Sequence, residues 1–153
     1  MDRMDITIRP ARPGDIPRMA ELLSELFALE SDFTADLEKQ RDGLSYLIAD
    51  PTGRSRLFVA EYAGTIVGLA SVQILISTAE GGRVGLVEDV IVDQRHRGAG
   101  IGTLLLDSIV VWSRKNGLRR LQLLSDEENL PAVNFYIRNG WSGTRLICLR
   151  HLL

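Results

Sequence analysis

The sequence predicts an α/β domain with a mixed central sheet and helices on both of its faces. Strand-like runs rich in β-branched residues alternate with segments in which apolar residues recur at helical spacing. In the first half, two strand-like runs flank a tight turn, which implies antiparallel pairing. In the second half, a strand, a glycine-rich loop and a helix precede another strand, which implies a parallel, right-handed crossover.

The chain is expected to begin with a short strand and a helix. Ile6 and Ile8 alternate with polar neighbours, as in a strand with one buried face. Asp15 can then cap a helix that carries Pro17 in its first turn, where a missing N–H is harmless. The following apolar residues recur at helical spacing, so this helix is expected to have one apolar face.

A second helix and a β-hairpin are expected next. The helix runs from Thr34, as its cap, to Asp50, and a proline and a glycine end it. From Arg56 the period becomes that of a strand, in the runs RLFVAEY and TIVGLASVQILIS. The pair Ala63-Gly64 between them predicts a tight turn. RVGLVEDVIV is expected to form the next strand.

The second half is expected to hold two more helices and two more strands. A helix follows the glycine-rich loop and ends at about Asn116. RRLQLLS predicts a strand, Asn129 caps a helix that ends at Gly140, and TRLICLRHLL predicts a closing strand. The full order is β-α-α-β-β-β-α-β-α-β, in a single domain over residues 1–153.

Composition excludes several classes of protein. With 45% hydrophobic and 25% charged residues and a net charge of −2, the chain is typical of a soluble domain with no general attraction to nucleic acid or membrane. No apolar run reaches the roughly 20 residues that span a bilayer. The single cysteine, Cys148, offers neither a disulfide nor metal-ligand spacing. We therefore expect a cytoplasmic protein without a metal and without nucleic-acid or membrane partners.

The stretch RHRGAGIG, residues 95–102, is expected to bind an anion. It lies between a strand and a helix, and the first N–H groups of a helix have no partners within it. Glycine lets a phosphate approach the backbone, while Arg95, His96 and Arg97 add positive charge. Two other phosphate motifs fail here. The third glycine of the dinucleotide fingerprint would fall at Thr103, and the Walker lysine is absent.

With these motifs the chain resembles the GCN5-related N-acetyltransferase (GNAT) family. The family signature, Arg/Gln-x-x-Gly-x-Gly/Ala after the fourth strand, is matched at residues 97–102 and also, in an earlier register, at residues 95–100. Residues 129–141 resemble a second family segment, N-x-x-A-x-x-x-Y-x-x-x-G-aromatic, with Tyr136 at the tyrosine. The order of elements agrees over nearly the whole chain.

The resemblance implies a GNAT-like acyl-CoA N-acyltransferase fold and the use of acetyl-CoA. The pyrophosphate would bind the glycine-rich loop, and the pantetheine arm would bond to the edge of the preceding strand. The residues implied for this role are Val90, Ile91, Val92, Arg97, Gly98, Ala99, Gly100, Ile101, Gly102, Thr103 and Asn129. For Asn129 we rank the role of helix cap above a direct contact. The family often dimerises through its last strands, which leaves a homodimer open.

The strand LVEDVIV carries two adjacent carboxylates. Strict alternation places Glu88 on one face and Asp89 on the other, and apolar residues on both faces indicate that both are covered. A buried carboxylate needs a partner or a task. Polyamine acetyltransferases have a similar Glu-Asp-x-x-Val run, so the resemblance implies that Glu88 is the general base, through water, unless solvent takes the proton. For Asp89, an arginine partner or a surface position explains the residue as well as substrate binding does.

The remaining candidates are Tyr136 and the segment that joins the first two helices. The motif implies that Tyr136 protonates the CoA thiolate, and packing of its ring is the alternative. Glu30 and Asp32 can attract a cationic amine that Phe33 covers, although a solvated acidic helix end explains them equally well. The favoured function is direct acetyl transfer, in a ternary complex, to a small and cationic primary amine. A protein N-acetyltransferase and a non-catalytic acyl-CoA-binding regulatory module are the alternatives.

Overall fold

The structure is a computed structural model that describes residues 5–30 and 32–153. The chain forms two compact units, the first up to Gln122 and the second from Leu123 to Leu153. The elements in chain order are β1 (Ile6–Pro10), η2 (Pro13–Asp15), α1 (Ile16–Leu29), α2 (Leu37–Ile48), β2 (Ser55–Tyr62), β3 (Thr65–Ser77), β4 (Gly82–Val92), η3 (Gln94–His96), α3 (Ile101–Lys115), β5 (Leu121–Leu123) and α4 (Leu130–Arg138).

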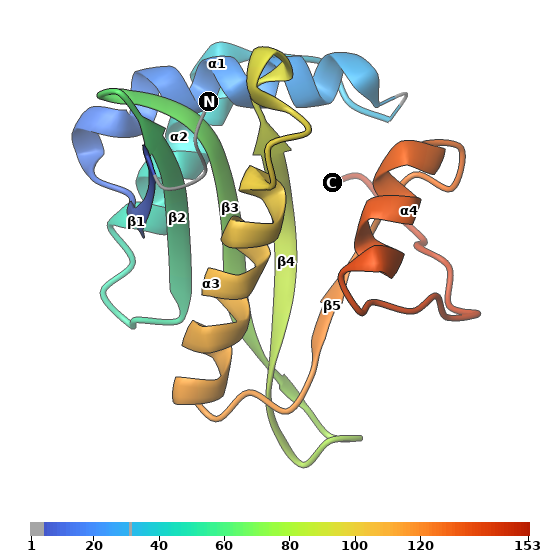
Figure 1. The fold of residues 1–153 in the computed structure, drawn as a ribbon. Coiled ribbons are helices and arrows are strands. Elements are labelled where there is room, and N and C mark those ends of the chain that lie inside the picture. Colours follow the sequence, from blue (N-terminus) through green and yellow to red (C-terminus); the bar gives the residue numbers. More distant parts are fainter. Residues whose placement is uncertain (1–4, 31) are drawn as a thin grey trace. The chain divides into compact units, whose positions relative to one another are not determined.

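The sheet has the strand order β1-β2-β3-β4-β5, and its first four strands are antiparallel (Figure 1). The predicted turn between β2 and β3 is confirmed. Ala63 and Gly64 both have positive φ, 49° and 78°, as a tight hairpin turn requires. Arg119 N–H donates to the carbonyl of Arg83, and Gly85 N–H to that of Arg120, both at 2.9 Å. From the first bond to the second, the residue numbers rise in both segments, from 83 to 85 and from 119 to 120, as in a parallel pair. The sheet is therefore mixed, as predicted.

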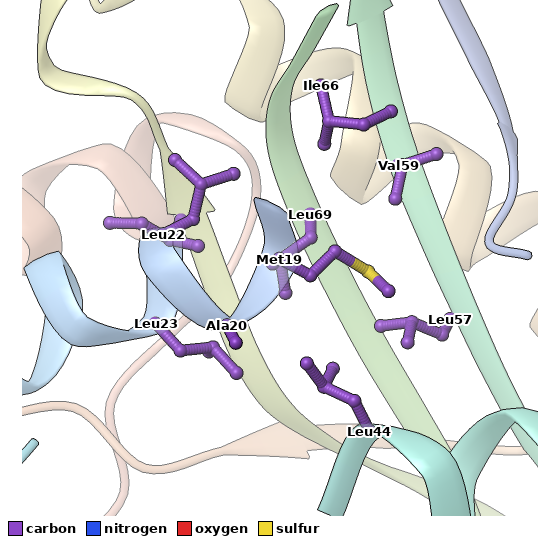
Figure 2. Close-up of a cluster of buried hydrophobic side chains, with 10 residues drawn as sticks. Met19, Ala20, Leu22, Leu23, Leu44, Leu57, Val59, Ile66 and Leu69 are labelled. Atoms are coloured by element: carbon purple, nitrogen blue, oxygen red, sulfur yellow. The ribbon is translucent and has the colours of Figure 1, made fainter. Parts of the chain in front are cut away.

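Helices cover both faces of the sheet in the first unit. Figure 1 shows α3 in front of the strands and α1 and α2 behind them. Behind the sheet, Met19 and Leu22 of α1 meet Leu44 of α2 and the inward side chains of β2 and β3 (Figure 2). Each such buried side chain contributes roughly 1.5–3 kcal/mol. This core is what holds α1 and α2 in place beside β4.

On the other face, Gly68 of β3 allows α3 to approach closely. A Cβ at this position would lie 3.2 Å from Cδ1 of Leu105 and 3.5 Å from Cγ2 of Ile101. It would also lie 3.1 Å from the carbonyl oxygen of Ile91, which is backbone and cannot move aside. Glycine at this position therefore sets how near the first turns of α3 pack to β3 and β4.

Helix α1 begins directly after Asp15, its N-cap residue, with Pro17 in the first turn, as predicted. The side-chain cap of α1 and the start of α2 differ from the prediction. The carboxylate of Asp15 does not cap α1. It binds the guanidinium of Arg9 at 2.8 and 3.0 Å and accepts from Arg12 N–H, in a 3-10 turn before the helix. The cap of α2 is Asp36, whose carboxylate accepts from Lys39 N–H at 3.2 Å, rather than Thr34. At α2, Asp36 therefore takes the role that the pattern gave to Thr34, two residues earlier.

The predicted closing strand is absent from residues 144–153, all of which the structure describes. Leu146, Ile147 and Leu149 are 76%, 80% and 87% exposed, respectively. A strand needs a neighbouring strand to bind its N–H and C=O groups, and an alternating pattern does not supply one. The preceding strand, β5, is also shorter than predicted, with three residues.

The second unit contains α4 and its predicted cap. The side-chain oxygen of Asn129 accepts from Ala132 N–H at 3.3 Å, and Pro131 lies in the first turn, so this prediction is confirmed. At the other end, Gly140 has a φ of 89°, and its N–H donates to the carbonyl of Ile137 at 3.1 Å. The helix therefore begins and ends close to the predicted residues.

Candidate active site

The glycine-rich loop connects the end of β4 to the start of α3. Gly98 and Gly100 both have left-handed backbone conformations, with φ of 80° and 82°. A Cβ at Gly98 would meet nothing within 4 Å, so the conformation of the backbone, and not crowding, favours glycine there. Gly100 is the N-cap of α3. The two glycines turn the chain so that the helix begins directly after the loop.

The start of α3 offers the geometry of an anion site. The first helical bond runs from Leu104 N–H to the carbonyl of Gly100, at 3.1 Å. The N–H groups of residues 101–103 precede this bond and so have no partner within the helix. The helix has 15 residues, and its dipole places partial positive charge at this end. A phosphate group fits these donors both in charge and in hydrogen-bonding capacity.

The basic side chains of the loop have separate contacts. Arg95 donates to the carboxylate of Asp93 through Nη2 at 3.2 Å. Arg97 donates through Nε to the carbonyl of Val92 at 3.0 Å, which holds the loop against the end of β4. The ring of His96 lies 5.9 Å from that of Tyr62, between centroids. These three residues precede the N-terminus of α3, as the sequence predicted, but Arg95 and Arg97 already bind Asp93 and the carbonyl of Val92.

A β-bulge interrupts β4 at its two carboxylates. Ala70 of β3 lies opposite Val90, and Val72 lies opposite Val87, so Ser71 alone faces both Glu88 and Asp89. A bulge breaks the alternation of side chains along a strand. Both carboxylates line the same cavity. The prediction that they point to opposite faces is therefore wrong.

This cavity has a volume of about 630 Å³, a size typical of sites for small molecules. It lies entirely in the first unit and brings together α1, α2, the segment between them, and strands β3 and β4. The residues that line it are Leu23, Phe27, Asp32, Phe33, Thr34, Asp36, Lys39, Gln40, Gly43, Leu44, Tyr46, Leu47, Gln73, Glu88 and Asp89. Of these described residues, four carry a carboxylate, and Lys39 carries an ammonium group.

Asp89 titrates in an unusual range. Burial, and then the negative charges of Glu88 and Glu30, raise the pKa of Asp89 to about 7. The side chain can therefore accept a proton near neutral pH, or remain ionised when a cation lies beside it. Glu88 is exposed at the cavity wall. The site thus combines a solvated carboxylate with a partly buried one.

The residues predicted for acceptor binding come together here. Asp32 and Phe33 line the cavity, and Glu30 is near enough to Asp89 to affect its pKa. The ring of Phe33 lies 5.4 Å from that of Phe27, between centroids. The sequence prediction missed the side chains that α2 contributes, such as Lys39. Their only signal was their place in an amphipathic helix, which does not distinguish a cavity wall from a solvated face.

Tyr136 and Asn129 belong to the second unit. The ring of Tyr136 lies 5.2 Å from that of Phe135 and 6.0 Å from that of Trp141, which it meets edge-on. The N–H of Trp141 also donates to the carbonyl of Tyr136, at 3.0 Å. Tyr136 is therefore held in an aromatic cluster at the end of α4. Its role as acid, and a contact of Asn129 with acetyl-CoA, stay predictions.

A helix N-terminus after a glycine loop, together with a small-molecule cavity at a bulged strand, is the arrangement expected of an acyl-CoA-dependent transferase. Residues 17–141 match the Acetyltransferase (GNAT) family, and the chain belongs to this family. It is an acetyl-CoA-dependent N-acetyltransferase. Within residues 5–30 and 32–153, no helix is both long enough and apolar enough to cross a membrane.

Two curated relatives match most of the chain. Glucosamine 6-phosphate N-acetyltransferase of Trypanosoma brucei brucei is 34% identical over 92% of this chain and 91% of the relative. Aminoglycoside N(6')-acetyltransferase type 1 of Stenotrophomonas maltophilia is 31% identical over 92% of this chain and 89% of the relative. Both are named for the acetylation of small amines.

A solved structure shares the fold. Aminoglycoside N-acetyltransferase AAC(6')-Iy, determined in complex with CoA, superposes with a TM-score of 0.81 at 15% sequence identity. The match covers 96% of this chain and 94% of that structure. At this level of identity the likeness concerns the fold, and it agrees with the predicted mixed sheet.

Proposed function

We propose that the protein transfers the acetyl group of acetyl-CoA to a primary amine of a small molecule that carries at least one further positive charge. The observation that supports this is the charge of the acceptor cavity, with Asp32, Asp36, Glu88 and Asp89 against Lys39. We further propose that residues 1–153 work as one acetyltransferase domain. The family match over residues 17–141 includes most of both compact units, which supports this.

The charge of the cavity should favour one of the two acceptors that appear in the relatives' names. Glucosamine 6-phosphate carries a phosphate as well as an amine, whereas aminoglycosides carry several ammonium groups and no phosphate. At about 4 Å, two unit charges interact by on the order of 4 kcal/mol near a protein surface. A phosphate in this cavity would meet several carboxylates and a single ammonium. A second ammonium group would be attracted by the same residues, so the polycationic acceptor is favoured.

The residues of β4 supply the proton acceptor in this proposal. An amine attacks the thioester only in its neutral form, and a free alkylamine has a pKa near 10, so a proton must first leave. Glu88 takes this proton through a water molecule. The amine nitrogen then forms a bond to the acetyl carbon, the C–S bond breaks, and the nitrogen releases its surplus proton to solvent to give the neutral amide. Tyr136 gives its phenolic proton to the departing thiolate and later regains one from solvent.

The same proposal assigns the acetyl-CoA contacts. The backbone N–H groups from Gly98 to Thr103 hold the pyrophosphate, and the edge of β4 from Val90 to Val92 bonds to the pantetheine arm. The left-handed glycines and the unpartnered first turn of α3 support the first assignment. The pantetheine assignment is supported by the position of two hydrogen bonds between β4 and the segment leading into β5. They involve residues 83 and 85, at the end of β4 opposite to Val90 and Val92.

A matched pair of acceptors tests the charge argument. Turnover of acetyl-CoA, followed as free thiol, is measured with glucosamine, glucosamine 6-phosphate, spermidine, an aminoglycoside and a peptide with a free N-terminus. We expect the highest kcat/KM with the polycationic amines, and glucosamine to be preferred to its phosphate ester. A preference for glucosamine 6-phosphate would reject the cationic acceptor, and a preference for the peptide would indicate a protein N-acetyltransferase.

A further inference from the structure

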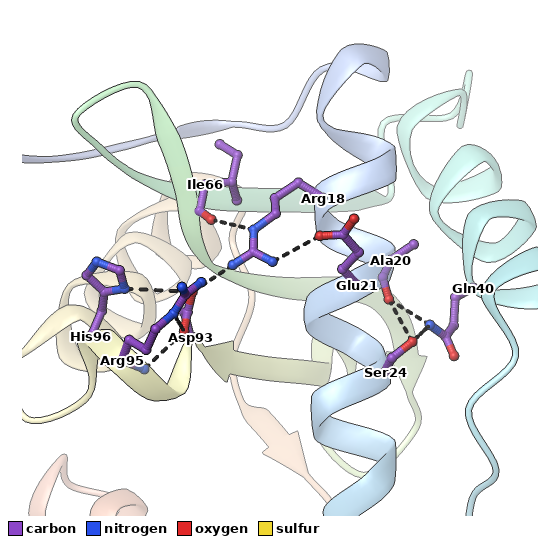
Figure 3. Close-up of polar contacts among 9 residues, drawn as sticks. All are labelled: Arg18, Ala20, Glu21, Ser24, Gln40, Ile66, Asp93, Arg95 and His96. Atoms are coloured by element: carbon purple, nitrogen blue, oxygen red, sulfur yellow. Dashed lines mark hydrogen bonds and ion pairs between the residues drawn. The ribbon is translucent and has the colours of Figure 1, made fainter.

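Asp93 is a buried carboxylate at the junction of β4 and the glycine-rich loop (Figure 3). Its side chain is 2% exposed. Oδ2 accepts from Nη2 of Arg18 at 2.7 Å and from Nη2 of Arg95 at 3.2 Å, while Oδ1 accepts from Arg95 N–H at 3.0 Å. The carboxylate therefore binds two guanidinium groups and one backbone N–H, all at the entrance to the loop.

The backbone of Asp93 is also fixed on both sides. Its N–H donates to the carbonyl of Val67 in β3 at 2.8 Å, which ties the residue to the sheet. Its own carbonyl accepts from His96 N–H at 2.8 Å, which closes the first turn of the loop. The course of the chain from β4 into residues 95–100 therefore depends on how Asp93 is held.

Arg18 connects this junction to α1. Its Nε donates to the carbonyl of Ile66 at 3.1 Å, and its Nη1 pairs with Glu21, also at 3.1 Å. The same helix carries Leu23 and Phe27, which line the acceptor cavity. The Arg18–Asp93 ion pair therefore joins the loop to the helix that forms one wall of that cavity (Figure 3).

The charges at this junction depend on one another. Burial raises the pKa of Asp93, but hydrogen bonds from Arg95 and the charges of Arg95 and Arg18 more than offset this, and the pKa lies below its usual range. The carboxylate is therefore ionised at neutral pH. Asp93 is the buried member of both ion pairs, so loss of its guanidinium partners would leave a buried charge uncompensated.

We propose that Asp93 is a positioning residue for the cofactor loop. Together with Arg18 and Arg95, it holds residues 95–100 in the conformation that presents the first N–H groups of α3 to the pyrophosphate. Arg95 then serves mainly to order the loop. This inference rests on the proposed role of the loop in binding acetyl-CoA.

The inference predicts a specific loss of affinity. A loop that is competent only part of the time binds with a dissociation constant raised in inverse proportion to the competent fraction. Asp93→Asn keeps the shape of the side chain and removes its charge. We expect it to weaken acetyl-CoA binding by about tenfold or more, as for a loop that is competent about a tenth of the time. The KM of the amine and the kcat at saturating acetyl-CoA should stay close to those of the wild type.

Asp15→Asn is the matched control. Asp15 forms a partly buried ion pair with Arg9 before the start of α1, and its carboxylate also accepts from a backbone N–H. This variant should lower the melting temperature and leave the acetyl-CoA affinity unchanged. If the role of Asp93 is purely structural, Asp93→Asn should likewise lower the melting temperature and leave the acetyl-CoA affinity unchanged. The dissociation constant from calorimetry, set beside the melting temperature, separates the two explanations.

Arg18→Met provides a second test of the inference, which remains available if Asp93→Asn does not fold. It should weaken acetyl-CoA binding in the same direction, and in the Asp93→Asn background it should add little further loss. Unchanged acetyl-CoA affinity in folded Asp93→Asn, or in folded Arg18→Met, overturns the inference. If the wild-type protein itself does not bind acetyl-CoA, the proposed role of the loop fails as well, which is a separate and recognisable outcome.

Discussion

The N–H of Asp89 donates to the hydroxyl oxygen of Ser71, at 3.4 Å, where one residue of β3 faces two of β4. This contact marks the bulge that brings Glu88 and Asp89 to the same cavity wall. Burial, and then the negative charges of Glu88 and Glu30, raise the pKa of Asp89. The bulge therefore makes the acceptor cavity both acidic and responsive to pH.

The first prediction concerns the pH dependence of stability. The pKa of Asp89 is about 7 in the folded protein and near 4 when unfolded, so between these values the folded state binds more protons. The stability of the wild type should therefore fall as pH rises from about 4 to about 7, by at most about 4 kcal/mol from this group. Asp89→Asn should remove this dependence and be more stable than the wild type at pH 8.

Urea unfolding of both proteins at pH 5 and pH 8 measures this difference. Asp50→Asn is the control, because the pKa of Asp50 is lowered to about 2 by hydrogen bonds from Thr52 and Ser55, outside the pH range of the experiment. An equal effect of Asp89→Asn at both pH values would contradict a titration of Asp89 in this range.

The second prediction concerns Glu88 as the general base. Glu88→Gln should depress turnover most near neutral pH, where almost all of the amine is protonated. The deficit should shrink at high pH, because more of the amine is already neutral there. The pH dependence of kcat/KM for Glu88→Gln and Asp89→Asn, measured side by side, identifies which carboxylate sets the acidic limb. A deficit in Glu88→Gln that is the same at every pH would indicate substrate positioning instead.

Much of the fold was predictable because its signals are local. The Ala63-Gly64 turn needs two residues of positive φ; Gly64 adopts this conformation freely, and Ala63 adopts it at a small steric cost. The Asn129 cap likewise depends only on its own helix. The bulge at Glu88 depends on pairing with Ser71 in another strand, which no pattern within β4 reveals. The segment 144–153 alternates like a strand, but strand formation requires a partner outside the pattern.

The candidate site also has one part that local sequence predicts and one part that depends on tertiary packing. The conformation of the glycine-rich loop was predictable, because glycine adopts positive φ without steric cost wherever it occurs. The acceptor cavity was only partly predictable. Asp32 and Phe33 follow from the position of their segment, whereas Lys39 and Gln73 reach the cavity through the packing of α2 and β3. Tertiary packing, and not local sequence, determines which polar side chains of an amphipathic element face a cavity.

The third prediction compares two glycines in the same conformation. Gly98, in the cofactor loop, and Gly117, after the end of α3, have φ of 80° and 72°, and a Cβ at either would meet nothing within 4 Å. Alanine at each position should therefore cost a similar stability, about 1–2 kcal/mol, from the left-handed backbone alone. Only Gly98→Ala should also weaken acetyl-CoA binding, as measured by calorimetry. Equal acetyl-CoA affinities in the two variants would count against the loop as the pyrophosphate site.

The last prediction concerns Tyr136. A phenol with a pKa near 10 is protonated at pH 7 and can give its proton as the C–S bond breaks. Tyr136→Phe keeps the ring that contacts Phe135 and Trp141, so α4 and its aromatic cluster should remain intact. We expect near-normal acetyl-CoA affinity and a turnover lowered by roughly one to three orders of magnitude, as for a lost general acid. Phe135→Leu, which disturbs the cluster but keeps the Tyr136 hydroxyl, should instead lower the melting temperature with a smaller effect on turnover. If Tyr136→Phe keeps at least about half of the wild-type turnover, well short of a general-acid effect, the phenol is not the acid and the thiolate must be protonated by water.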